Sequence, residues 1–328
     1  MEGNKTMATT TMARYGVDLT NPAHVAAAWA SLAEPGDAWA GHLRQTLGSV
    51  EALEWATSPY TELGLNGPGN HFAHEMAWQN AWQRWNLGRI ETPTVKTDLR
   101  QLADLGGRLI LPGTQEWPTQ LDALGNTAPP ALWVLGKAPI NTDPNRTVSV
   151  AGARAATHYG EQITHTLAGN LAAAGATIVS GGAYGIDSTA HRAALNNATE
   201  MDTANTIAIV CGGLQNLYPT GNAELFNRII EEGGAIVAEV RPSARPARGR
   251  FLERNRLIAA WSNVTLIPEA GLRSGAMATA QRATKLHRKV AAVPGPITSF
   301  SSQGPHELIR TRRAHITTTA EEVQALLA

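Results

Sequence analysis

The chain has 328 residues, long enough for one large domain or two smaller ones with a substantial core. Lys and Arg number 27, as do Asp and Glu, so a polyanionic partner would need a local cationic patch rather than the overall charge. The single cysteine, Cys211, excludes a disulfide framework; with no signal peptide and no bilayer-length apolar run, we expect a cytoplasmic protein.

The first third of the chain has helical character. Residues 1–20 lack periodicity and predict a flexible leader. Asn21 as a cap, with Pro22 at the first helical position, predicts a helix that ends before Pro35-Gly36. Further helical stretches cover residues 37–58 and 71–89, so residues 21–105 are predicted to form a small all-helical (SAM-like) domain.

Three tryptophans in the last of these stretches, Trp78, Trp82 and Trp85, fall on one helix face because they are spaced by four and three residues. Such a face could stack nucleic-acid bases or pack against another helix. We favour the packed helix interface.

From Thr147 onward, short apolar runs alternate with helical stretches. Near-continuous apolar strands separated by helices are typical of a parallel sheet covered on both faces. We therefore predict that residues 106–328 form a Rossmann-like, doubly wound α/β domain with a mostly parallel sheet. The expected strand runs are 147–153, 177–182, 206–213, 235–240, 263–270 and 289–295.

Glycine, serine and arginine collect just after these strands. In such sheets ligands bind at the carboxyl ends of the strands, and helix N-termini there expose N–H groups that suit phosphate oxygens. With Arg154, Arg254 and Arg256 nearby, the pattern predicts a concave, cationic, phosphate-binding surface.

Evidence for catalysis is weak. There is no G-x-G-x-x-G pattern and no P-loop. Asp187 and His191 are four residues apart but lack a third metal ligand, so we interpret them as a helix-start acid and a packed histidine. Glu239 and Glu269 end strands without an evident partner. We expect a protein that holds its ligand, with no enzymatic activity, cofactor or metal.

Six ordered motifs carry a resemblance to a known family: "TVSVAGARAATHYG", "IVSGGAYGIDSTAHRAAL", "TIAIVCGGLQNLYP", "FLERNRLIAAWSNVTLIPEA", "RSGAMATAQRATKLHRKVAAVPGPI" and "GPHELIR". Over about residues 99–320 the chain resembles the DNA-processing protein A family, DprA or Smf. This resemblance implies a bacterial, non-enzymatic protein that binds and protects single-stranded DNA, loads a RecA-type recombinase during transformation, and forms a homodimer.

The resemblance also implies DNA-contacting residues. They are Gly152 and Arg154 after the first strand, the loop Ser180, Gly181 and Gly182, the element Arg254, Asn255 and Arg256, and the helix start Ser274 and Gly275. Tyr184 stands where the family usually has arginine, and could stack a base or be a partly buried structural residue. From the short stretch after the last motif, we expect the winged-helix domain that many members append to be absent.

Other arginines and other functions stay as alternatives. Arg241, Arg245, Arg248 and Arg250 lie in a Pro-rich segment that is either a solvated flexible loop or an extension of the DNA track. Arg310, Arg312 and Arg313 are interpreted as solvated charges at the sheet edge. A nucleotide-binding Rossmann enzyme or sensor of the phosphoribohydrolase kind is the rival function. It is disfavoured because "PEAGLRSGAMATA" lacks a carboxylate after the SG turn. A protein-interaction adaptor would leave the glycines and arginines unexplained.

Overall fold

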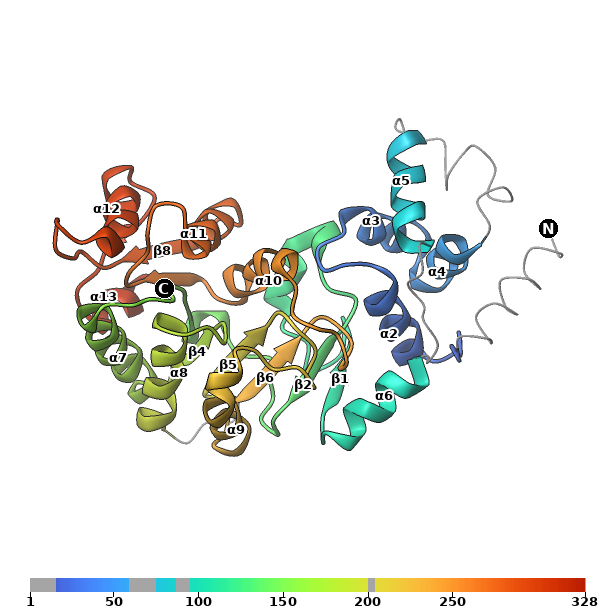
Figure 1. Cartoon of the computed structure of the whole chain (residues 1–328), viewed down its shortest axis with the longest axis horizontal. Coiled ribbons are helices and arrows are strands. Elements are labelled where there is room, and N and C mark those ends of the chain that lie inside the picture. Colours follow the sequence, from blue (N-terminus) through green and yellow to red (C-terminus); the bar gives the residue numbers. More distant parts are fainter. Residues whose placement is uncertain (1–15, 59–74, 87–94, 200–203, 328) are drawn as a thin grey trace.

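The computed structural model describes residues 16–58, 75–86, 95–199 and 204–327. Most of the predicted leader, residues 1–15, lies outside the described residues. The helices of the first third of the chain form one end of an elongated molecule, and the α/β part forms the rest (Figure 1). The helices at this end are α2 (Pro22–Leu32), α3 (Ala38–Leu47), α4 (Ser49–Thr57), α5 (Glu75–Asn86) and α6 (Val95–Asp104).

The local signals at the first helix are confirmed, whereas the second predicted helix is two helices. The side chain of Asn21 accepts a hydrogen bond from the backbone N–H of Ala23 at 2.9 Å, as expected of a helix cap. The stretch 37–58 breaks at Gly48, whose φ of 79° is in the left-handed region that other residues rarely adopt. The chain therefore turns there between α3 and α4.

The tryptophan face of α5 packs inside the helical part. Trp78 and Trp85 are 4% and 1% exposed, and their rings meet edge to face at 6.4 Å. The indole N–H of Trp82 donates to the carbonyl of Ser58 at 3.0 Å. This confirms the packed helix interface. The hydrophobic cluster around these tryptophans also includes Trp133 of the sheet. The helical part and the sheet therefore share a core, and the domain boundary at residue 105 stays a prediction.

The sheet has the expected class, but its strands at both edges were not predicted. Its nine strands have the order β1-β2-β6-β5-β4-β3-β7-β8-β9, and all pairs from β6 to β9 in this order are parallel. The two antiparallel strands at one edge and the short β9 at the other were not predicted. The bounds are β1 (Arg108–Ile110), β2 (Leu132–Leu135), β3 (Thr147–Val150), β4 (Thr177–Ser180), β5 (Thr206–Val210), β6 (Ala235–Ala238), β7 (Val264–Ile267), β8 (Lys289–Ala292) and β9 (His315–Ile316).

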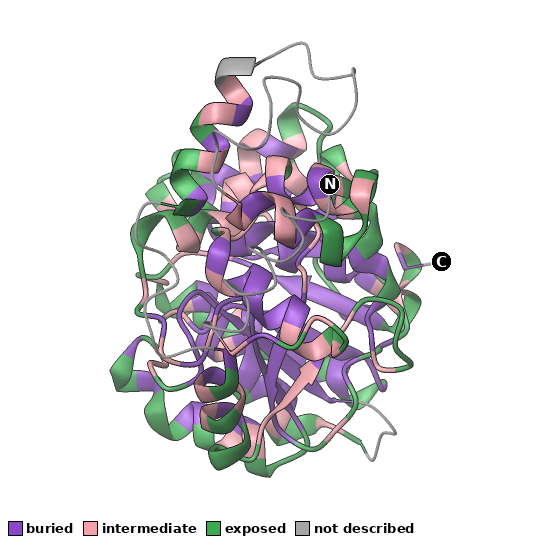
Figure 2. Ribbon diagram, turned by 90° about the vertical axis from the view of Figure 1, so that its right-hand side faces the viewer, coloured by how far each residue is buried: buried purple, intermediate pink, exposed green. Residues whose placement is uncertain are grey.

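Helices cover both faces of the sheet, and the buried strands run through the middle of the molecule (Figure 2). Alternate residues of a strand point to opposite faces, so Leu266 packs in the cluster of α7 and α8 while Ile267 packs in that of α10 and α11. The helices of this part are α7 (His158–Ala173), α8 (Ile186–Asn197), α9 (Ala223–Glu231), α10 (Arg248–Trp261), α11 (Gly275–Lys285), α12 (Gln303–Arg310) and α13 (Ala320–Ala325).

The strand order places a topological switch point at β3. This strand lies between β4, which follows it in the chain, and β7, which follows much later. Connections leave β3 and β7 in opposite directions, so a crevice opens at their carboxyl ends. The loops that carry the predicted site residues therefore converge there.

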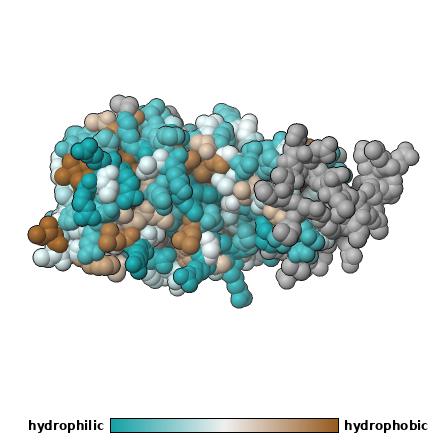
Figure 3. All heavy atoms as spheres, turned by 90° about the horizontal axis from the view of Figure 1, so that it is seen from above, coloured by the Kyte–Doolittle hydropathy of each residue, from teal (hydrophilic) through white to brown (hydrophobic). Residues whose placement is uncertain are grey.

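The described surface is largely hydrophilic in the view from above, with apolar patches mainly toward the end where α11 and α12 lie (Figure 3). The most exposed large apolar side chains, Ile297 and Phe300, belong to the segment between β8 and α12. None of the described helices combines the length and the apolar character that a membrane span requires.

Candidate nucleic-acid interface

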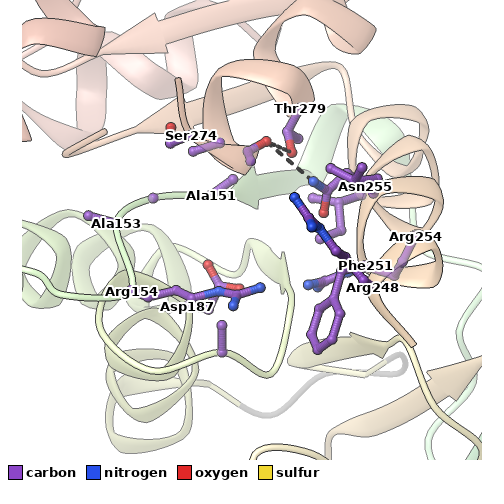
Figure 4. A pocket seen from close by; sticks show the side chains of 16 residues that line it. Ala151, Ala153, Arg154, Asp187, Arg248, Phe251, Arg254, Asn255, Ser274 and Thr279 are labelled. Atoms are coloured by element: carbon purple, nitrogen blue, oxygen red, sulfur yellow. Dashed lines mark hydrogen bonds between the residues drawn. The ribbon is translucent and has the colours of Figure 1, made fainter. Parts of the chain in front are cut away.

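A cavity of about 670 Å³ lies at the carboxyl ends of the central strands. Its walls are the loop after β3, the start of α8, one face of α10 and the N-terminus of α11, and side chains from these elements point toward one another (Figure 4). The lining residues are Ala151, Gly152, Ala153, Arg154, Ala183, Asp187, Arg248, Phe251, Leu252, Arg254, Asn255, Ile258, Ser274, Gly275, Ala276 and Thr279.

Arg254 and Asp187 form the buried floor of this cavity, and each is only 7% exposed. The guanidinium of Arg254 donates from Nη1 to the carbonyl of Ile209 at 2.9 Å, while its buried Nε has no hydrogen-bond partner among the described residues. Gly181 makes this arrangement possible, because a Cβ there would lie 1.8 Å from Nη1 of Arg254. The floor of the cavity therefore carries the positive charge of Arg254, which favours an anionic ligand.

Burial and charge oppose each other at the two floor residues. Burial raises the pKa of the Asp187 carboxyl, and the nearby Arg254 charge counteracts this. Burial lowers the pKa of the Arg254 guanidinium, and Asp187 counteracts that in turn. Arginine remains protonated in proteins. Since Asp187 is the only acidic residue among those that line the cavity and arginine occurs there three times, the cavity is cationic.

The mouth of the cavity combines arginine with an aromatic ring. The guanidinium of Arg154 lies 4.9 Å from the ring centroid of Phe251, and the ring of Tyr218 meets Phe251 edge to face at 5.8 Å. Arg154 and Arg248 are both exposed, and neither forms an ion pair within the described part of the chain. Two cations are thus open to a ligand, beside the half-buried ring of Phe251.

The start of α11 forms the remaining wall. Ser274 caps this helix, its hydroxyl accepting from the N–H of Met277 at 3.4 Å. The Asn255 amide donates to the carbonyl of Gly275 at 3.3 Å and thereby joins α10 to α11 (Figure 4). The helix N-terminus therefore faces the cavity with its positive end, which favours an anion.

The structure brings six of the eleven predicted residues to the cavity: Gly152, Arg154, Arg254, Asn255, Ser274 and Gly275. The three predicted residues at and just after the end of β4 do not line the cavity, because this segment packs beneath it. The Ser180 hydroxyl is fully buried and donates to the carbonyl of Val150 at 2.7 Å. Gly181 lies under Arg254, and a Cβ on Gly182 would be 2.5 Å from Cζ of Phe226. These two glycines therefore allow close packing within the protein.

Arg256, also predicted to contact DNA, does not line the cavity either. Its guanidinium forms a bidentate ion pair with Glu239, with Nη2 at 2.5 Å and Nη1 at 2.7 Å from the carboxylate oxygens. Its Nε donates to the carbonyl of Thr127 at 2.9 Å, and the residue is 4% exposed. Residues two apart on a helix point in nearly opposite directions, so Arg254 and Arg256 cannot serve one groove.

Tyr184 is 49% exposed and does not line the cavity. Its hydroxyl lies against Gly221, where a Cβ would be 2.5 Å away. The ring is neither buried nor in contact with the cavity, so both interpretations of this residue stay open.

The Pro-rich arginine segment is partly helical, which corrects its interpretation as a flexible loop. Helix α10 starts at Arg248, and this arginine lines the cavity. Arg250 instead pairs with Glu34 of the helical part at 2.9 Å. Arg248, Phe251 and Asn255 are spaced by three and four residues, which defines one helix face. Extending the helical pattern back from "RNR" would have identified Arg248 and Phe251.

Groups considered for catalysis are occupied by other contacts. Glu239 binds Arg256, and the carboxylate of Glu269 accepts hydrogen bonds from the backbone N–H and hydroxyl of Thr157. Both ring nitrogens of buried His191 have partners, and burial lowers its pKa to about 4. Burial also raises the pKa of the Cys211 thiol. Among the described residues, no three His, Cys, Asp or Glu side chains are placed to hold a metal.

Comparisons with known proteins agree on one protein family. The family model of DNA recombination-mediator protein A matches residues 108–328. A relative from Mycobacterium tuberculosis, provisionally named DNA processing protein DprA, is 40% identical over 311 residues, which cover 91% of this chain and 74% of the relative.

Two solved structures are similar as well. DNA processing protein A from Helicobacter pylori, whose structure describes a single-stranded DNA binding mode, has a TM-score of 0.59 and 32% identity, covering 67% of this chain and 95% of that one. DprA from Streptococcus pneumoniae has a TM-score of 0.68 and 24% identity, covering 90% of this chain and 94% of that one, which supports the fold.

Proposed function

Because the chain belongs to the DNA recombination-mediator protein A family, we propose that it binds single-stranded DNA in the cavity at the switch point of its sheet. The observation that carries the proposal is a cavity lined by three arginines, of which Arg154 and Arg248 are exposed at its mouth and form no ion pair within the described residues. Strand phosphates would supply the anions that these arginines lack. The single-stranded DNA binding mode described for the Helicobacter pylori relative supports the same ligand.

The chemistry of the cavity suits the backbone of a strand more than the edges of its bases. Arg154, Arg248 and the N-terminus of α11 would bind phosphate oxygens, and the ring of Phe251 would stack a base. A cavity of about 670 Å³ is within the range of small-ligand sites, so it would take a short segment of the strand while the rest follows the surface. Binding should therefore tolerate many sequences.

We further propose that the protein holds the strand without altering it. Glu239 and Glu269 have protein partners, and Cys211 is buried with a raised pKa, so these candidate groups are poorly placed for reaction. Protection of single strands, loading of a RecA-type recombinase, a role in transformation and a homodimeric state are proposals that rest on family membership alone.

A binding titration tests the proposal. Fluorescence anisotropy would compare a labelled oligothymidylate with its duplex, and an unlabelled mononucleotide would compete for the site. We expect the single strand to bind more tightly than the duplex, and the mononucleotide to compete weakly. Preference for the mononucleotide would instead support the nucleotide-binding enzyme or sensor.

A further inference from the structure

Glu269 forms an internal contact at the first turn of α7. It follows β7, is 1% exposed, and binds Thr157, the N-cap residue of α7. One carboxylate oxygen accepts from the Thr157 N–H at 2.9 Å, and the other accepts from its hydroxyl at 2.6 Å. A Cβ at Gly160 would lie 2.1 Å from the carboxylate, so the glycine leaves space for it.

The Glu269 carboxylate lies beside the switch point of the sheet. Helix α7 follows β3, and β3 and β7 flank the switch point of the sheet. In doubly wound nucleotide-binding sheets, the N-terminus of a helix at this place receives the ligand phosphate. Here the positive end of the helix already faces an anion from the protein itself.

The loop that carries Arg154 is held by the same residue at two points. The backbone N–H of Ala153 donates to the carbonyl of Glu269 at 2.8 Å, and Thr157 binds the Glu269 side chain. Arg154 lies between these two contacts. The guanidinium of Arg154 reaches the ring of Phe251 across the mouth of the cavity, so the course of the loop determines where this cation lies.

We propose that Glu269 is a positioning residue for DNA binding, whose carboxylate takes the place of a ligand phosphate at α7 and so fixes the loop that presents Arg154. The proposal rests on the proposed function. It also reverses a simple electrostatic expectation, because removing a negative charge near a DNA site would by itself strengthen binding. A positioning role requires that binding weaken instead.

A double-mutant cycle tests this role by anisotropy with labelled oligothymidylate. The variants are Glu269→Gln, Arg154→Ala and the two together. Glu269→Gln is expected to weaken binding about fivefold, a typical coupling for residues in one network (about 1 kcal/mol). In the Arg154→Ala background the same change should no longer weaken binding, because the cation that it positions is gone.

A second pair of variants keeps the test valid if Glu269→Gln folds poorly. Thr157→Val removes the hydroxyl with little change in shape and should weaken binding, whereas Thr157→Ser retains the hydroxyl and should restore it. Asp37→Asn is the matched control. Asp37 is another largely buried carboxylate that caps a helix, α3, but it lies in the helical part. It should lower the melting temperature without changing DNA affinity.

The outcomes separate the two proposals. If the wild-type protein does not bind oligothymidylate, both fail. If it binds and Arg154→Ala weakens binding, the proposed function stands. The positioning role is then overturned if Glu269→Gln leaves binding unchanged or strengthens it, or if its loss is equally large in the Arg154→Ala background.

Discussion

Replacing Arg154, Arg248 and Arg256 one at a time with alanine would identify the arginines that bind the strand. Arg154 and Arg248 line the cavity and are exposed, whereas Arg256 is buried in an ion pair with Glu239. We expect the first two variants to lose affinity for single strands at an unchanged melting temperature. The third should lose stability instead.

The magnitudes follow from these placements. Each phosphate contact on a single strand contributes about 0.7 to the slope of log affinity against log salt, so one lost contact changes the ratio of affinities between about 50 and 200 mM salt by about 2.6-fold. At low salt each cavity variant should bind at least about tenfold more weakly, because a hydrogen bond to a charged group contributes about 1.5–3 kcal/mol. Arg256→Ala leaves Glu239 buried without its partner, which should cost about 3–5 kcal/mol in the free energy of unfolding.

The assay is fluorescence anisotropy at several ionic strengths, with thermal melts of every variant. Arg313→Ala is the control, because Arg313 is exposed, lies 3.7 Å from Glu307 and does not line the cavity. It should change neither the slope nor the melting temperature. The reasoning is refuted if Arg154→Ala and Arg248→Ala keep the parental slope, or if Arg256→Ala flattens the slope at full stability.

Three further changes probe single contacts. Gly181→Ala would place a Cβ 1.8 Å from Nη1 of Arg254, so it should lower both the melting temperature and DNA affinity. Gly249→Ala is its control, with no atom within 4 Å of the added Cβ, and an equal effect of both would contradict the argument. If Tyr184 stacks a base, Tyr184→Ala should cost about 1–3 kcal/mol of binding free energy in anisotropy titrations while Tyr184→Phe is neutral; unchanged affinity of the alanine variant would exclude stacking. Burial lowers the pKa of His191 from 6.5 to about 4. Between these two pH values the native His191 stays neutral, while the same histidine in the unfolded chain takes up a proton. The free energy of unfolding should thus fall by up to about 1.4 kcal/mol per pH unit as pH drops through this interval. Urea unfolding of His191→Gln should lack this contribution, and an identical pH dependence would contradict the assignment.

Much of the architecture could be predicted because it depends on local pattern. Short apolar runs separated by helices indicated a parallel sheet, and each of the six predicted runs contains a strand. The cap at Asn21 was recognisable because a cap involves neighbouring residues. The edge strands β1 and β9 and the strand β2 next to β1 were missed. Two of them, β1 and β9, have only three and two residues, too few for a periodic signal.

The tertiary structure decided which residues line the cavity. The sequence placed Arg254 and Arg256 together, but a helix turns about 100° per residue, so only Arg254 faces the cavity. Arg256 is bound by Glu239 and by the carbonyl of Thr127, which are 17 and 129 residues away in the chain. Gly181 and Gly182 are small because Arg254 and Phe226 pack on them. Such contacts join distant segments and exist only once the chain has folded, which is why the sequence determined the kind of surface and the fold determined its residues.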